Sequence, residues 1–143
     1  MIRNIRLEDA KAIRDISEFS LGYKTTEAVT ERQIAKLLKD RQHFIRVYED
    51  DETHTVVGFI HAEAYELLYK ESGFNILGLA VLPEYRRCGI GRQLLQAVEA
   101  ETAARNYRFI RLNSGEQRKE AHVFYERCGY TCTKLQKRFI KEW

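Results

Sequence analysis

The chain has 143 residues, of which 44% are hydrophobic, 31% charged and 11% aromatic, and its formal net charge is +3. This length is enough for one domain with its own core, and a single proline and eight glycines exclude collagen-like and low-complexity classes. No apolar run approaches the roughly 18 to 20 residues that span a bilayer, and the first residues lack the apolar stretch of a signal peptide. We therefore expect one soluble, cytoplasmic domain over residues 1–143.

The charge balance and the cysteines exclude further classes. A net charge of +3 is too small to indicate a nucleic-acid-binding protein, for which we would expect a strongly basic domain with its positive charges concentrated in a stripe. Cys88, Cys128 and Cys132 are odd in number and form no Cys-x-x-Cys pair, so we expect reduced thiols, no disulfide framework and no metal site. Three of the histidines show no metal or triad spacing and are expected to be structural or solvent-facing: His43, His54 and His122.

Hydrophobic periodicity divides the chain into alternating helices and strands. Helices are expected at residues 8–20, 30–38, 89–105 and 121–128, and strands at 1–6, 43–49, 56–65, 74–82, 109–112, 130–135 and 138–143. Thr30 and Gln33 form a capping box, and the run at 74–82 lacks alternation, which predicts a strand buried on both faces and ended by Pro83. The order β-α-α-β-β-β-α-β-α-β-β predicts an α/β (α+β) fold with helices around one sheet.

The segment between the buried strand and the long helix has the features of a phosphate-binding loop. It reads Arg86-Arg87-Cys88-Gly89-Ile90-Gly91-Arg92. Glycines let a backbone approach a ligand, the first turn of a helix favours an anion, and arginines suit phosphate oxygens. The spacing fits neither the dinucleotide fingerprint G-x-G-x-x-G nor the P-loop. The plainer alternative is a helix start with two turn glycines and solvated arginines.

Two segments resemble the motifs of the GNAT superfamily of N-acetyltransferases. Residues 79–92, LAVLPEYRRCGIGR, resemble its Leu-x-Val-x-Pro strand followed by Arg/Gln-x-x-Gly-x-Gly/Ala and a long helix. Residues 118–125, RKEAHVFY, resemble its Asn-x-x-Ala-x-x-x-Tyr motif, with Arg118 where Asn is usual. The order of elements also resembles the family fold over essentially the whole chain, which implies a mixed, mostly antiparallel central sheet flanked by helices.

The resemblance implies acetyl-CoA as the acyl donor. Its pyrophosphate would lie on the arginine loop, and its pantetheine arm along the backbone of the strand that ends at Val81. The candidate coenzyme A-binding residues are Leu79, Ala80, Val81, Arg86, Arg87, Cys88, Gly89, Ile90, Gly91, Arg92, Asn113 and Arg118.

The resemblance also implies that Tyr125 is a general acid for the departing CoA thiolate, and the alternative is that Tyr125 packs in the core beside Phe124. The family often carries a carboxylate on the central strand, and residues 75–78 contain none. On the neighbouring strand His61, Glu63 and Tyr65 alternate onto one face. We therefore take Glu63 and His61 as candidate bases, against the alternative that they are exposed polar groups at a fraying strand end.

The resemblance, taken with these residues, implies an N-acetyltransferase that moves an acetyl group to a primary amine, of a small molecule rather than a protein, by direct attack in a ternary complex. We expect two segments to line the acceptor site: residues 21–29, with Tyr23, Lys24 and Glu27, and residues 63–69, with Glu66. The alternatives are a CoA-binding sensor without catalysis and, less favoured, a nucleic-acid module. We expect no nucleic-acid or membrane partner, and the apolar residues at 139, 140 and 143 leave open a homodimer or a strand of the chain's own sheet.

Overall fold

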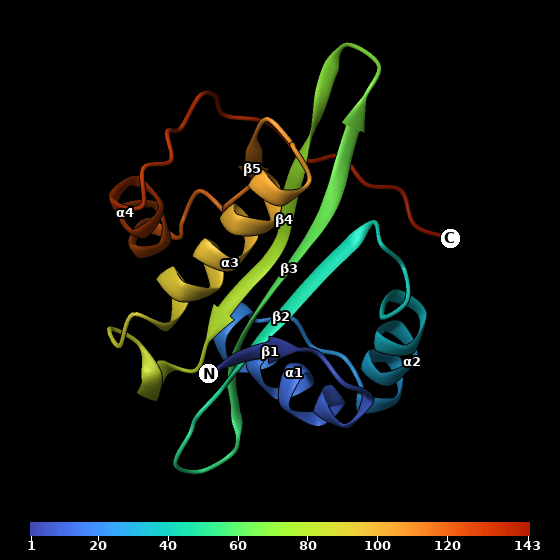
Figure 1. Cartoon of the computed structure of the whole chain (residues 1–143), viewed down its shortest axis with the longest axis vertical. Coiled ribbons are helices and arrows are strands. Elements are labelled where there is room, and N and C mark those ends of the chain that lie inside the picture. Colours follow the sequence, from blue (N-terminus) through green and yellow to red (C-terminus); the bar gives the residue numbers. More distant parts are fainter. The chain divides into compact units, whose positions relative to one another are not determined.

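A computed structural model describes all 143 residues. The chain divides into two compact units, Met1–Asn113 and Ser114–Trp143. In the first unit the strands are β1 (Ile2–Asn4), β2 (His43–Glu49), β3 (Val56–Leu67), β4 (Lys70–Val81) and β5 (Ile110–Leu112), and the helices are α1 (Ala10–Ile16), α2 (Glu27–Leu37) and α3 (Ile90–Ala104) (Figure 1). Short helical turns cover Leu7–Asp9, Ser17–Leu21 and Pro83–Tyr85. No helix is long and apolar enough to cross a membrane.

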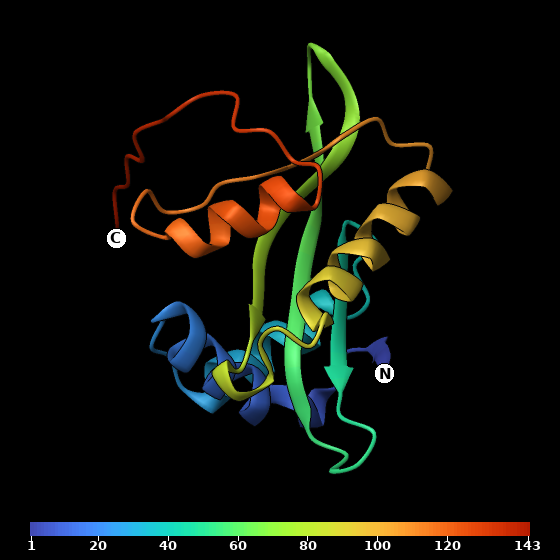
Figure 2. The same ribbon diagram turned by 90° about the vertical axis from the view of Figure 1, so that its left-hand side faces the viewer.

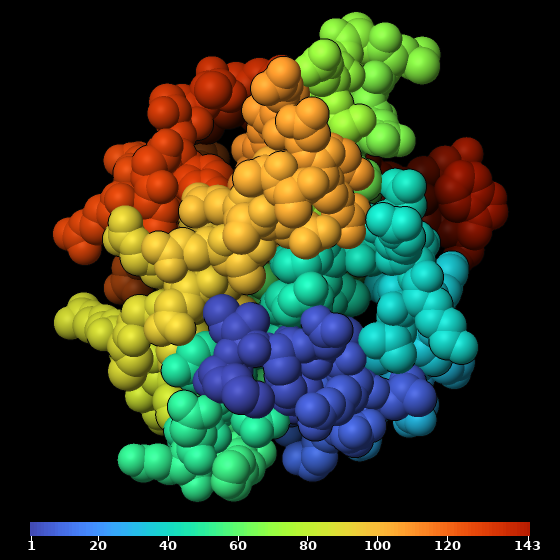
Figure 3. Space-filling model, viewed as in Figure 1, coloured from blue at the N-terminus to red at the C-terminus, as the bar shows by residue number.

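The five strands form one sheet in the order β1-β2-β3-β4-β5. The first three pairings are antiparallel and β4 pairs with β5 in parallel, which confirms the predicted mixed, mostly antiparallel sheet. Figure 2 shows α3 on one side of the strands and α1 on the other. The space-filling view of the α3 side shows that helix and the first residues of the chain lying over the strands (Figure 3).

Each face of the sheet buries alternate residues of the strands. On the α1 and α2 face the core contains Ile13, Ile16, Ile34, Val47 and Phe59. The opposite face buries the other set of alternate strand residues, among them Phe44, Ile60 and Phe74. These residues lie beneath the apolar side of α3, where Leu94, Leu95 and Val98 are buried. Helices thus flank the sheet as predicted.

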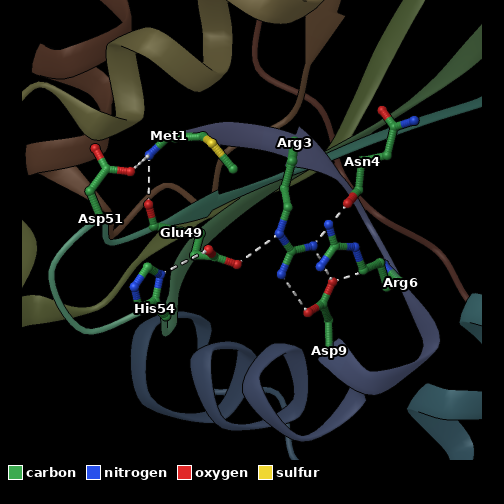
Figure 4. Close-up of polar contacts among 8 residues, drawn as sticks. All are labelled: Met1, Arg3, Asn4, Arg6, Asp9, Glu49, Asp51 and His54. Atoms are coloured by element: carbon green, nitrogen blue, oxygen red, sulfur yellow. Dashed lines mark hydrogen bonds and ion pairs between the residues drawn. The ribbon is translucent and has the colours of Figure 1, made fainter.

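A buried ion-pair network joins β1 to β2 and to the start of the first helix (Figure 4). The Arg3 guanidinium donates through Nη1 and Nη2 to the two carboxylate oxygens of Asp9, at 2.9 Å each, and through Nε to Glu49 Oε1 at 2.9 Å. The side chains of Arg3, Asp9 and Glu49 are only 11%, 5% and 17% exposed. One arginine therefore neutralises two largely buried carboxylates, and its hydrogen bonds hold the pKa of Glu49 below its usual range.

The long strand β4 differs from the prediction in its middle. A β-bulge lets His61 pair with Gly78 and Ala62 pair with Ile76, so that Leu77 is the extra residue on β4. The Leu77 side chain is 49% exposed, which makes the expectation of a strand buried on both faces wrong at this point. The apolar run could not show this, because a bulge depends on the register with the partner strand.

The second helix begins earlier than predicted. Thr26 is its N-cap, since Thr26 Oγ1 accepts a hydrogen bond from the Val29 N–H at 3.1 Å. Thr30 is buried inside the helix, where its hydroxyl donates to the Thr26 carbonyl at 3.2 Å, so the predicted capping box at Thr30 is wrong. The irregular part of the predicted acceptor-wall segment is therefore confined to residues 22–26.

The second unit contains α4 (Lys119–Arg127), which ends before Gly129, a residue in the left-handed conformation with φ of 93°. This agrees with the predicted helix and its glycine stop. Residues 130–143 form no strand, so the last two strands of the predicted order are wrong. Leu135, Phe139 and Trp143 are at least four-fifths exposed. Their spacing lacks the strict alternation of a half-buried strand, and charged residues at 134, 137, 138 and 141 add to the cost of burying the segment.

Candidate functional site

The arginine loop has a backbone shape that suits an anion. Arg87 and Gly89 both adopt the left-handed conformation, with φ of 65° and 79°, and Gly89 is the N-cap of α3. The first backbone hydrogen bond into the helix runs from the Gln93 N–H to the Gly89 carbonyl at 3.1 Å. The N–H groups of the three preceding residues, Ile90 to Arg92, therefore have no acceptor within the helix, and the positive end of the helix dipole lies beside them.

The side chains of this loop add charge without closing it. Arg86, Arg87 and Arg92 are all exposed, whereas Ile90 is 4% exposed and packs into the core. Ile90 can thus meet a ligand only through its backbone. The Cys88 thiol is exposed and lies 3.6 Å from the Arg86 carbonyl. Backbone N–H groups and arginines together fit a polyphosphate.

The strand that leads into this loop has one open edge. The parallel pairing of β4 with β5 covers only Phe74 to Ile76, so the residues from Leu77 to Val81 have a strand neighbour only on the β3 side. Ala80 is 5% exposed, and the Val81 carbonyl accepts a hydrogen bond from Ser20 Oγ at 2.9 Å. What this edge offers a ligand is therefore mainly backbone N–H and C=O groups, which could hold the amides of an extended chain as a neighbouring strand would.

Polar side chains cross the α1 and α2 face of the sheet in a row, which we call the polar strip. It consists of His43 on β2, His61 and Glu63 on β3, Asn75 on β4 and Arg111 on β5. The strand register places His43 opposite Glu63, Glu63 opposite Asn75, and Asn75 opposite Arg111. Residues paired in this way lie on the same face of the sheet, so four strands contribute to one polar surface.

Hydrogen bonds connect both ends of the polar strip. His43 Nδ1 and His61 Nε2 lie 2.9 Å apart. At the other end Arg111 donates to Asn75 Oδ1 at 2.7 Å and to Asn113 Oδ1 at 2.8 Å, and Asn75 Nδ2 makes a weak 3.5 Å contact with Glu63 Oε2. Burial, with a smaller contribution from the charge of His43, lowers the pKa of His61 to about 4. His61 is therefore neutral at pH 7.

The bulge places His61 beside the open part of β4. His61 pairs with Gly78, the residue just before the segment from Leu79 to Val81. Gly78 has no side chain, and a Cβ there would meet only the Phe59 ring, at 3.6 Å. The two predicted bases on β3 thus lie next to the predicted pantetheine strand, within one unit of the structure. That they alternate onto one face agrees with the sequence pattern.

Tyr125 and Arg118 belong to the second unit. The Tyr125 ring lies 5.2 Å from that of Phe124 and 6.2 Å from that of Tyr130, and burial raises the pKa of its phenol to about 12 against the opposing charge of Arg118. Arg118 stands just before α4 as its N-cap residue. Both the packing role and a role for the hydroxyl are compatible with these contacts.

Sequence reasoning missed three members of the polar strip: His43, Asn75 and Arg111. Each occupies a position that faces the same side as Glu63 on its own strand, but only the register between strands reveals this. The expected acceptor-wall residues Tyr23, Lys24 and Glu27 are exposed, and the Glu66 carboxylate accepts from Ser72 Oγ at 3.0 Å. The structure contains no group of three side chains that could hold a metal ion.

A mixed sheet that opens along one central strand, with a glycine- and arginine-containing helix start at the end of that strand, is the arrangement expected of an acyltransferase. A model of the acetyltransferase (GNAT) domain matches residues 40–132. An uncharacterized N-acetyltransferase of Chlorobaculum tepidum is 32% identical over 133 residues, which cover 90% of this chain and 74% of that protein. The chain therefore belongs to the GNAT acetyltransferase family, whose members use acyl-CoA donors, and it is an N-acetyltransferase.

Solved structures show the same fold. The structure titled a transcriptional regulator from Bacillus halodurans has a TM-score of 0.87 at 19% identity, over 99% of both chains. The aminoglycoside 6'-N-acetyltransferase AAC(6')-Ih of Acinetobacter baumannii has a TM-score of 0.85 at 20% identity, over 100% of this chain and 98% of that one. At these identities the likeness establishes the α+β fold.

Proposed function

We propose that residues 1–143 act as a single functional domain that transfers the acetyl group of acetyl-CoA to a primary amine of a small molecule. The observation that carries the proposal is the loop from Arg86 to Arg92, in which free helix N–H groups and exposed arginines converge at the end of an open-edged strand. This arrangement fits a pyrophosphate followed by an extended, amide-containing arm. Asn113, held by Arg111, and Arg118 are further candidate contacts.

Acetyl-CoA, when bound, supplies an activated thioester carbonyl. The amine nitrogen attacks its carbon, a C–N bond forms, the C–S bond breaks, and the sulfur leaves as a thiolate. A free backbone N–H on the open edge of β4 stabilises the negative charge that develops on the carbonyl oxygen. We expect direct attack, because the chain offers no paired cysteine and histidine for a covalent intermediate. None of the three thiols, at Cys88, Cys128 and Cys132, lies on a strand that contributes to the polar strip.

The amine must lose a proton before it attacks. For an alkyl amine of pKa about 10.4 this costs about 4 to 5 kcal/mol at pH 7. Glu63 and His61 are the proposed acceptors, since both face the same side of β3 and His61 lies opposite Gly78 on the open strand. A neutral imidazole and a carboxylate both accept protons. Because burial lowers the pKa of His61 to about 4, transfer of the amine proton to His61 is uphill, and His61 holds that proton only in passing.

Tyr125 is proposed to serve the departing sulfur. A thiol has a pKa of about 8.5, whereas burial raises the pKa of Tyr125 to about 12. Complete transfer of the phenolic proton to the thiolate is therefore uphill. We propose that Tyr125 stabilises the thiolate by donating a hydrogen bond, which a fully protonated phenol does well.

The proposed acceptor is a small amine. The solved aminoglycoside 6'-N-acetyltransferase takes a small molecule according to its name, and the carboxylates of Glu27, Glu63 and Glu66 offer charge to a cation. The second candidate is a CoA sensor without catalysis, which the lack of a carboxylate at residues 75–78 favours.

Thermal unfolding with and without acetyl-CoA tests the donor. A ligand at 100 times its dissociation constant adds about 2.7 kcal/mol of stability. We expect wild type to be stabilised, Arg87→Glu to lose most of that gain, and Arg32→Glu, an exposed arginine on α2 with the same charge change, to keep it. No stabilisation of wild type at millimolar acetyl-CoA would refute the donor. Stabilisation without release of free CoA thiol, across alkyl diamines, amino sugars and aminoglycosides, would favour the sensor.

A further inference from the structure

We propose that His43 and His61 form a two-imidazole proton relay, which carries the proton of the acceptor amine from the inside of the site to solvent. The inference rests on the proposed acetyl transfer and adds His43 as its outer member.

The strand order places His61 next to the open part of β4 and His43 one strand farther from it. His61 lies in the middle of β3 opposite Gly78, and His43 is the first residue of β2. Because His61 Nε2 is joined to His43 Nδ1 at 2.9 Å, the remaining nitrogens are His61 Nδ1 and His43 Nε2. These two nitrogens are the ends of the chain of hydrogen bonds. The rings are tilted by 43° with their centroids 5.1 Å apart, so contact through the nitrogen edges, rather than stacking, joins them.

The protons balance along this path. The amine N–H bond breaks as His61 Nδ1 gains the proton. The Nε2–H bond of His61 then breaks as His43 Nδ1 gains its proton, and His43 Nε2–H releases one to water. Each imidazole holds an extra proton only in passing. After the products leave, water that enters the site takes the proton from His61 Nδ1, His43 Nδ1–H returns its proton to His61 Nε2, and His43 Nε2 regains one from solvent, which restores the starting tautomers. No oxidant or further reactant is needed.

The surroundings keep His61 neutral in the resting state. Burial lowers the pKa of His61, and His43 acts on it in the same direction. The other charged groups near the pair are Glu63, which is paired with His43 across the strands, and Asp40, whose backbone carbonyl accepts a hydrogen bond from the backbone N–H of His43 at 3.0 Å. On β4 the facing residue is Gly78. The helix residues buried on this side carry no charge: Ala10, Ile13, Ile16, Thr30 and Ile34.

A relay differs from a merely orienting contact in what His43 must do. Orientation of His61 needs one hydrogen bond, which an asparagine amide at position 43 can supply from a similar place. Proton transfer needs a second nitrogen on the same ring, which asparagine lacks. The proposal also concerns only amines that are protonated at pH 7, so an aromatic amine, which is neutral there, bypasses the relay.

The test measures kcat and KM of the full chain with acetyl-CoA, for an alkyl amine and an aromatic amine that wild type acetylates. We expect His43→Asn to lower kcat for the alkyl amine by about 10- to 100-fold, with KM nearly unchanged. This loss is smaller than the roughly 100- to 10,000-fold loss in rate that removal of a general acid or base usually causes. With the aromatic amine kcat should change less than about twofold. Added imidazole should restore part of the alkyl-amine rate in His43→Ala. His54→Asn, an exposed histidine outside the polar strip, is the matched control.

The outcomes separate the relay from the acetyl transfer itself. Equal losses with both amines, or full activity of His43→Asn, would overturn the relay while leaving the transferase activity in place. If His43→Asn does not fold, His43→Phe and the imidazole response of His43→Ala decide the same question. If wild type binds acetyl-CoA but acetylates no amine, the proposed function and the relay both fall.

Discussion

Replacing Gly89 by alanine should destabilise the chain although the new methyl group touches nothing. Gly89 has a φ of 79°, and a Cβ built there meets no atom within 4 Å. The left-handed conformation costs an L-residue about 1 to 2 kcal/mol, while alanine lowers the entropy of the unfolded chain and returns about 0.4 to 1 kcal/mol. The net loss is about 1 kcal/mol, which lowers Tm by about 2 to 4 °C in a chain of this size.

The assay is thermal unfolding of Gly89→Ala beside wild type and Gly78→Ala. Gly78 is the matched control, because its φ lies outside the left-handed region and its added Cβ would be in ordinary contact with Phe59 at 3.6 Å. We expect Gly78→Ala to match wild type in Tm or to exceed it slightly. A Gly89→Ala variant as stable as wild type would refute the left-handed start of α3, and with it the backbone shape of the proposed phosphate loop.

Three further predictions concern stability and follow from single contacts. Arg3→Met leaves the 5%-exposed carboxylate of Asp9 without its cation, and urea unfolding should show a loss of about 3 kcal/mol or more. Gly73→Ala places a Cβ 2.5 Å from the Phe109 carbonyl, so overpacking should cost about 1 to 3 kcal/mol in the same assay. Burial lowers the pKa of His61 from 6.5 to about 4 in the folded chain. Between pH 6.5 and about pH 4 the unfolded chain therefore binds more protons than the folded chain. The free energy of unfolding should fall by up to about 3 kcal/mol as the pH drops through this range. His61→Gln should remove this part of the pH dependence, and a pH profile unchanged by the substitution would contradict the assigned burial.

The fold could be predicted wherever the sequence pattern of a single segment determines its secondary structure. Alternation in residues 43–49, helical spacing after Gly89 and the glycine stop at Gly129 each depend on neighbours in sequence, and the structure has all three. The start of α2 was not predictable in this way. Thr26 and Thr30 are both good caps, and the burial of Thr30 against the rest of the fold decides between them.

The same division applies to the candidate site. The loop from Arg86 to Arg92 is contiguous, so its glycines and arginines could be recognised together. The polar strip takes residues from four strands separated by up to 68 positions, from His43 to Arg111, and only the pairing register brings them onto one surface. Strand prediction at residues 130–143 failed for a related reason, since a strand exists only where another supplies its hydrogen bonds.

The register also explains why a carboxylate at position 63 of β3, with none at residues 75–78 of β4, is a consistent arrangement. Glu63 lies directly opposite Asn75, and like charges at paired positions destabilise a sheet. A second carboxylate at 75 would repel Glu63, whereas the amide of Asn75 contacts Glu63 with its nitrogen and accepts from Arg111 with its oxygen. Gly78, opposite His61, likewise leaves space instead of a charged group. The lack of acidic residues at 75–78 is therefore weak evidence for a chain without catalysis, because the neighbouring strand presents the proposed proton acceptors, His61 and Glu63, on the same face.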